Sequence, residues 1–139
     1  MNDLSPVLVI EDEESLLALF LSALGRTGLR AVGARSGGQA LGLLESGDYA
    51  GIVSDLRLPG GPNGADIFDW VRQNRPELSR RFLFITGDLY APDTEQVRQR
   101  TGAMFLEKPF RVGKMLELVR EIISQAPTSA STWQKRVGG

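Results

Sequence analysis

The sequence contains no cysteine and no histidine among its 139 residues. Without cysteine, the chain cannot form a disulfide scaffold, ligate an iron–sulfur cluster or use a thiol nucleophile. Without histidine, it cannot carry out Ser-His-Asp catalysis, hold a histidine-ligated zinc ion or carry a phosphohistidine of its own. A functional site in this protein must therefore depend on oxygen atoms as nucleophiles and ligands.

The sequence also lacks a marked excess of either charge and any long apolar run. Its 16 Lys and Arg residues balance 17 Asp and Glu residues, so it has no strong long-range attraction to nucleic acid or anionic lipid. No stretch approaches the roughly 18 apolar residues of a membrane span. Residues 1–6 include no cationic start of an export signal. We therefore expect a cytoplasmic protein that binds neither nucleic acid nor a membrane.

Short apolar runs alternate along the chain with segments of helical periodicity. Residues 7–10 read Val-Leu-Val-Ile, which is typical of a strand buried on both faces of a parallel sheet. The pattern predicts strands at residues 7–10, 29–34, 49–54, 82–86 and 103–106, and helices at residues 16–24, 37–46, 67–75, 92–100 and 112–123. About five strand–helix repeats predict a three-layer α/β sandwich, with half of a Rossmann fold as the alternative strand order.

The length of the chain fits one domain, which we place at residues 1–125. Residues 126–139 are rich in Pro, Ser and Thr, and we expect them to form a disordered tail. The pattern gives no role for Trp133 in this tail.

Charged and polar residues stand at the predicted carboxyl ends of the strands. Glu11 and Asp12 follow the first strand, and Asp55 follows the third. Thr86 ends the fourth strand and Lys108 follows the fifth. Neighbouring parallel strands lie about 4.8 Å apart, so the three carboxylates converge if the first and third strands are adjacent. Such a cluster either raises a carboxyl pKa or binds a hard cation, and an all-oxygen set favours Mg²⁺ or Mn²⁺ over zinc.

We favour the metal site over the alternative that each acid acts locally. In that alternative, Glu11 and Asp12 only stabilise the N-terminus of a helix, and Asp55 only caps a loop. It does not explain why Lys108 and Thr86 should stand near the same acids.

These motifs, in this order, resemble the receiver domain of bacterial two-component response regulators. The resemblance spans about residues 5 to 125. It implies a flavodoxin-like fold, with a five-stranded parallel sheet in the order 2-1-3-4-5. The motifs are the pair Glu11-Asp12, Asp55 within Ser-Asp-Leu-Arg-Leu-Pro-Gly, Thr86-Gly87, and Phe-Leu-Glu-Lys-Pro-Phe at residues 105–110.

The resemblance implies a signalling phosphoacceptor rather than a metabolic enzyme. Asp55 would attack the phosphorus of a phosphohistidine on a sensor histidine kinase or a phosphotransfer protein. Glu11, Asp12, Asp55 and the backbone carbonyl of Arg57 would hold Mg²⁺, with Mn²⁺ as a substitute. Lys108 would supply a second positive charge to the phosphoryl oxygens, and the Lys108–Pro109 peptide bond would be cis.

The resemblance also implies a switch that a downstream protein can recognise. Thr86 would donate its hydroxyl hydrogen to the phosphoryl group, and Phe105 would follow it inward. This movement would change the face formed by the helix at 92–100, the strand at 103–106 and the helix at 112–123. We expect this face to bind an unknown target or to form a homodimer.

Three features differ from the usual pattern of the family. Glu11 stands where Asp is more common, so we expect it to reach the metal through water. The loop between Gly60 and Gly64 is one residue longer than usual. Phe105 stands where many relatives have Tyr, and it can be buried without leaving a hydroxyl unpaired.

Arg57 and Asp88 should flank the path of the water that hydrolyses the phosphorylated form. An ion pair between them would make that form long-lived. The alternative is an exposed pair of little energetic weight.

Three other functions are alternatives to a phosphoacceptor. A flavin-binding electron carrier is disfavoured because the acids at residues 11–14 would repel its phosphate. A phosphatase with an aspartyl nucleophile usually has a second acid where this chain has Arg57. The remaining alternative is a pseudo-receiver that binds partners without phosphorylation. We expect either a stand-alone receiver or the receiver segment of a hybrid kinase.

Overall fold

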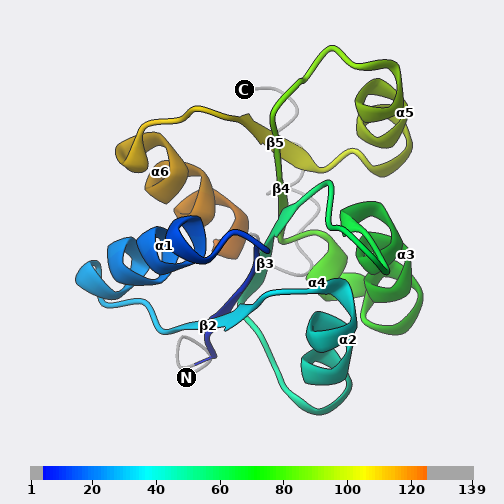
Figure 1. Cartoon of the computed structure of the whole chain (residues 1–139). Coiled ribbons are helices and arrows are strands. Elements are labelled where there is room, and N and C mark those ends of the chain that lie inside the picture. The colour runs from blue at the N-terminus through cyan, green and yellow to red at the C-terminus, as the bar shows by residue number, and fades with distance from the viewer. Residues whose placement is uncertain (1–4, 125–139) are drawn as a thin grey trace.

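Five parallel strands form one sheet at the centre of the fold (Figure 1). The computed structural model describes residues 5–124, so the predicted tail from residue 126 lies outside the described residues. The strands are β1 (Val7–Ile10), β2 (Ala31–Ala34), β3 (Gly51–Asp55), β4 (Phe82–Thr86) and β5 (Met104–Glu107). Their order in the sheet is β2-β1-β3-β4-β5. This order confirms the flavodoxin-like arrangement, and the alternative of a Rossmann half is wrong.

Helices cover both faces of the sheet. They are α1 (Glu14–Arg26), α2 (Gly37–Ser46), α3 (Gly64–Asn74), α4 (Pro76–Ser79), α5 (Pro92–Thr101) and α6 (Val112–Ile123). In Figure 1, α1 and α6 lie on one face of the sheet, and α2, α3 and α4 lie on the other. α5 stands apart, near the edge formed by β5. Within residues 5–124, no helix has the length and hydropathy required to cross a membrane.

The central strands are buried on both faces because successive side chains along a strand point to opposite sides. In β1, Val7 and Val9 belong to the apolar core beneath α1 and α6, whereas Leu8 and Ile10 belong to the core beneath α2 and α3. All four side chains are almost fully buried. The continuous apolar sequence of β1 therefore reflects two helical layers rather than one.

Some elements differ from their predicted positions. β2 begins at Ala31 instead of residue 29, because the Leu29 N–H donates back to the Leu24 oxygen at 3.2 Å and closes the turn after α1. The short helix α4 was not predicted, although Pro76 stands in its first turn, where proline is favoured. The remaining strands lie within two residues of their predicted bounds.

The end of β3 and the start of α3 approach each other closely at Gly64. α3 begins there, earlier than predicted, because Asn63 and Asp66 form a capping box. The Gly64 N–H donates to the Leu56 oxygen at 3.0 Å, and a Cβ atom on Gly64 would lie only 2.5 Å from the Asp55 carbonyl oxygen. A side chain at this position would push against the backbone that carries Asp55.

We therefore expect Gly64→Ala to destabilise the fold by about 1 to 3 kcal/mol, the usual cost of overpacking. Urea denaturation measures this difference in the free energy of unfolding. Gly42→Ala is the matched control, because Gly42 is exposed in α2 and a Cβ there would meet no atom within 4 Å. The free energy of unfolding of Gly42→Ala should rise by about 0.5 to 1 kcal/mol. Unchanged stability in Gly64→Ala would contradict the expected clash.

Candidate functional site

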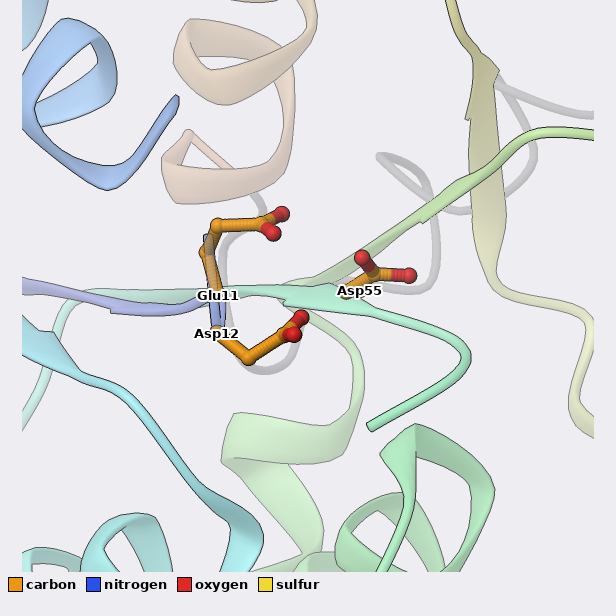
Figure 2. Close-up of side chains that lie close together, drawn as sticks. All are labelled: Glu11, Asp12 and Asp55. Carbon is orange, nitrogen blue, oxygen red and sulfur yellow. The ribbon is translucent and has the colours of Figure 1, made fainter. Parts of the chain in front are cut away.

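Three carboxylates meet at the carboxyl ends of β1 and β3. Glu11 and Asp12 follow β1, and Asp55 is the last residue of β3. The two strands are adjacent and parallel, with Ile10 opposite Ser54, so the residues that follow lie side by side. One oxygen atom from each of the three acids lies within 4.8 Å of the others. Figure 2 shows the three side chains gathered around one space.

Lys108 reaches the same cluster from the end of β5. The Lys108 N–H donates to the Thr86 carbonyl oxygen at 2.8 Å, which continues the pairing of β5 with β4. Its Nζ atom donates to Asp55 Oδ2 at 3.0 Å and lies 3.8 Å from Glu11 Oε1. The peptide bond between Lys108 and Pro109 is cis, as the resemblance implies.

Lys108 is held as a cation. Burial lowers its pKa, but the hydrogen bond to Asp55 and the charges of Asp55 and Glu11 outweigh burial and raise the pKa above its ordinary value. The ammonium group therefore supplies a fixed positive charge to the cluster.

Glu11 is the most deeply buried acid of the cluster, at 1% exposure. The pKa of Glu11 is raised to about 7, chiefly by burial and also by the charge of Asp55. The Glu13 N–H, which donates to Glu11 Oε2 at 3.1 Å, and the charge of Lys108 oppose this increase. Glu11 Oε1 is buried and accepts no hydrogen bond from residues 5–124. A buried carboxylate oxygen that accepts no hydrogen bond is unfavourable, and a bound cation would relieve it.

Both oxygen atoms of Asp55 are engaged by protein groups. Oδ1 accepts from the Arg57 N–H at 3.1 Å, and Oδ2 accepts from Lys108. The Asp55 side chain is buried, with 9% of it exposed. A carboxylate that is held by two hydrogen bonds and keeps a small exposed fraction is well oriented to attack a substrate or to bind a cation.

Thr86 and the loop after β4 form a separate hydrogen-bonded unit beside the acids. The Thr86 hydroxyl is buried and accepts from the Asp88 N–H at 3.2 Å. Asp88 Oδ1 accepts from the Tyr90 N–H at 2.9 Å, and Glu107 Oε2 accepts from the Leu89 N–H at 3.2 Å. The loop is therefore tied to the ends of both β4 and β5.

Phe105 packs against the core. Its ring stacks on that of Phe84 with centroids 4.9 Å apart, and the side chain is partly buried.

The ion pair between Arg57 and Asp88, one of the two arrangements considered from the sequence, is not present among residues 5–124. Arg57 instead forms a bidentate pair with Asp93 in the first turn of α5, with Nη1–Oδ2 at 2.7 Å and Nη2–Oδ1 at 2.9 Å. The carboxylate of Asp88 accepts from the backbone of its own loop instead. The acid two residues after Thr86 therefore stabilises a turn, and the next helix supplies the partner of Arg57.

Sequence reasoning missed Asp93 and Arg35. Arg35, just after β2, donates through Nη2 to the Asp12 carbonyl oxygen at 3.2 Å. Asp93 could be recognised from the sequence only as an acid in the first turn of a helix, which carries no information about a distant arginine. Arg35 follows a predicted strand end, and this position could have suggested a place beside the acids.

The sequence matches the family model described as the response regulator receiver domain over residues 7–120. It is 24% identical over 120 residues to the polar-differentiation response regulator DivK of Brucella ovis, an alignment that covers 86% of this chain and 97% of DivK.

Two solved structures have the same fold. The non-phosphorylated HemR receiver domain of Leptospira biflexa has a TM-score of 0.77 and 28% identity, over 88% of this chain and 96% of that one. The response regulator TrrA of Thermotoga maritima, solved in complex with Mg²⁺ and BeF, has a TM-score of 0.73 and 21% identity, over 85% and 98%. The family model matches most of the chain, and the sheet order and the acidic cluster agree with it. We conclude that the chain belongs to the response regulator receiver domain family.

Proposed function

We propose that this receiver domain accepts a phosphoryl group on Asp55 from a phosphohistidine of a sensor histidine kinase or a phosphotransfer protein. The observation that carries this proposal is the position of the Asp55 carboxylate, which lies beside two further acids and 3.0 Å from the Lys108 ammonium. One nucleophilic oxygen, a fixed cation and a set of hard ligands are the parts that phosphoryl transfer requires.

The residues of the cluster fit Mg²⁺, and Mn²⁺ could replace it. The ligands would be the carboxylates of Glu11, Asp12 and Asp55, with the backbone carbonyl of Arg57. The fit rests on an all-oxygen donor set and on the buried Oε1 of Glu11, which accepts no hydrogen bond from residues 5–124. When bound, Mg²⁺ would offset the negative charge of the acids and of the incoming phosphoryl oxygens. The related TrrA was solved with Mg²⁺ and BeF.

In the transfer step, a bond forms between an Asp55 oxygen and phosphorus while the phosphorus–nitrogen bond of the donor breaks. The donor imidazole leaves with that electron pair. Lys108 keeps its positive charge throughout because its pKa is raised, so it can pair with the phosphoryl oxygens. The Arg57 N–H keeps the Asp55 side chain oriented during the step.

The hydroxyl of Thr86 can couple phosphorylation of Asp55 to a conformational change at the surface. It already accepts from the Asp88 N–H, and its own hydrogen remains available to a phosphoryl oxygen. Drawing Thr86 toward that oxygen would move the loop after β4, and Phe105 would follow. The face of α5, β5 and α6 would then differ between the two states and bind a downstream protein or a second copy of this chain.

Intact mass spectrometry tests the proposal directly. Incubation with acetyl phosphate and Mg²⁺ should add the mass of one phosphoryl group to the wild-type protein and none to Asp55→Asn. Asp48→Asn is the matched control, because it removes an exposed acid that pairs with Arg75 and is not part of the acidic cluster, and it should be phosphorylated like the wild type. Absence of uptake by the wild type would instead favour a pseudo-receiver that binds partners without phosphorylation.

Magnesium should stabilise the protein through the acidic cluster. At 100 times its Kd, Mg²⁺ should raise the free energy of unfolding by about 2.7 kcal/mol. Asp12→Asn should lose most of this gain because it removes a ligand, whereas Asp48→Asn should keep it. Urea denaturation with Mg²⁺ or with EDTA measures the effect. Equal stabilisation of Asp12→Asn and the wild type would contradict the assignment of the ligands.

Without metal, stability should depend on pH through Glu11. Its pKa is about 7 in the fold against an ordinary 4.5, so between these values the folded state holds a proton that the unfolded chain releases. The Glu11 contribution to stability is therefore present below about pH 4.5 and is lost as the pH rises through about 7. Glu11→Gln, which cannot ionise, should keep it.

In EDTA near pH 8, Glu11→Gln should be more stable than the wild type by about 1 to 3 kcal/mol. The difference should shrink steadily as the pH approaches the ordinary pKa of a glutamate. Glu45→Gln controls for the loss of an exposed charge. A Glu11→Gln difference that stays constant with pH would show that Glu11 does not titrate as described.

A further inference from the structure

The helix α5 is docked weakly. Thr94 is its only buried residue, and Val97 is only partly buried against the core. The buried Thr94 hydroxyl has no hydrogen-bond partner among residues 5–124, and burying an unpaired hydroxyl opposes docking. Apolar packing therefore contributes little to holding this helix, and polar contacts must contribute much of the rest.

Ion pairs hold α5 near both of its ends. At the first turn, Asp93 pairs with Arg57 in a bidentate geometry. Near the last turn, Arg100 pairs with Asp69 of α3. Exposed ion pairs usually contribute little to the stability of a whole domain. A helix with one buried side chain has few other contacts, so these pairs have an unusually large influence on whether it stays docked.

Arg57 belongs to the proposed phosphoacceptor site as well as to the contact with α5. Its N–H donates to Asp55 Oδ1 at 3.1 Å, while its guanidinium binds Asp93. The hydrogen bond to Asp93 raises the pKa of Arg57, and the charges of Asp88 and Asp55 raise it further. The guanidinium of Arg57 therefore lies in the electrostatic field of Asp55 while it is bound to α5.

We propose that the Arg57–Asp93 ion pair couples the docking of α5 to the phosphorylation of Asp55. The inference rests on the proposed function. Phosphorylation would change the charge on Asp55 from −1 to about −2 and add oxygen acceptors beside Arg57. These acceptors compete with Asp93 for the guanidinium, so the first turn of α5 is released. By linkage, breaking the pair should favour the phosphorylated state to the same degree.

Hydrogen exchange on the full chain tests this coupling. The reporters are the amides of residues 95–98, whose helical acceptors are the carbonyls of residues 91–94. With Mg²⁺ and acetyl phosphate, these amides of the wild type should exchange about three- to fivefold faster than without phosphodonor. In Asp93→Asn, they should exchange fast in both conditions. Asp93→Glu, which keeps the charge, should restore the response.

Glu95→Gln is the matched control, because it breaks the Arg98–Glu95 pair within the same helix without touching Arg57. It should respond to phosphorylation like the wild type. As a reciprocal measurement, Asp93→Asn should bind beryllium fluoride in the presence of Mg²⁺ about three- to fivefold more tightly than the wild type. Calorimetric titration measures that affinity.

The outcomes separate the coupling from the proposed function. If intact mass shows no phosphate on the wild type, both fail. If Asp55 is phosphorylated but the amides of residues 95–98 exchange unchanged, the coupling fails and the phosphoacceptor function stands. The coupling also fails if Asp93→Asn responds like the wild type, or if Glu95→Gln loses the response.

Discussion

Electrostatic repulsion between three converging carboxylates is the constraint around which this end of the molecule is organised. The adjacency of β1 and β3 brings Glu11, Asp12 and Asp55 together. The chain offsets part of the resulting negative charge with Lys108. One buried oxygen of Glu11 still accepts no hydrogen bond from residues 5–124, and the pKa of Glu11 is raised to about 7. Such an arrangement is costly for folding alone, and it is consistent with a site that is completed by a cation and a phosphoryl group.

Much of this site could be predicted from the sequence, because the positions involved are fixed by strand ends. Glu11, Asp12 and Asp55 follow apolar runs whose direction in a parallel sheet is determined, so their side chains must appear at the same edge. Periodicity alone could not give the order of the strands, since it does not record which strands are neighbours. That order came from the resemblance and was then found in the structure.

The contacts of Arg57 and Asp88 could not be predicted in this way. Their partners depend on the path of a loop and on the placement of α5, and neither leaves a periodic signal. Asp88 accepts from the backbone of its own turn, and Arg57 binds Asp93 on the following helix. Through Arg57, a contact outside the acidic cluster joins the proposed reaction site to a weakly docked helix. Arg57 can therefore take part both in the proposed phosphorylation site and in the response of α5.

The most direct test is a pH titration of the Glu11 carboxyl group, monitored by carbon NMR, with and without Mg²⁺. The buried acidic cluster predicts a Glu11 pKa of about 7 in EDTA and a marked decrease once Mg²⁺ is present, because the cation favours the charged form. A Glu11 pKa that stays the same in both conditions would contradict the claim that these carboxylates are arranged to bind a cation beside Asp55.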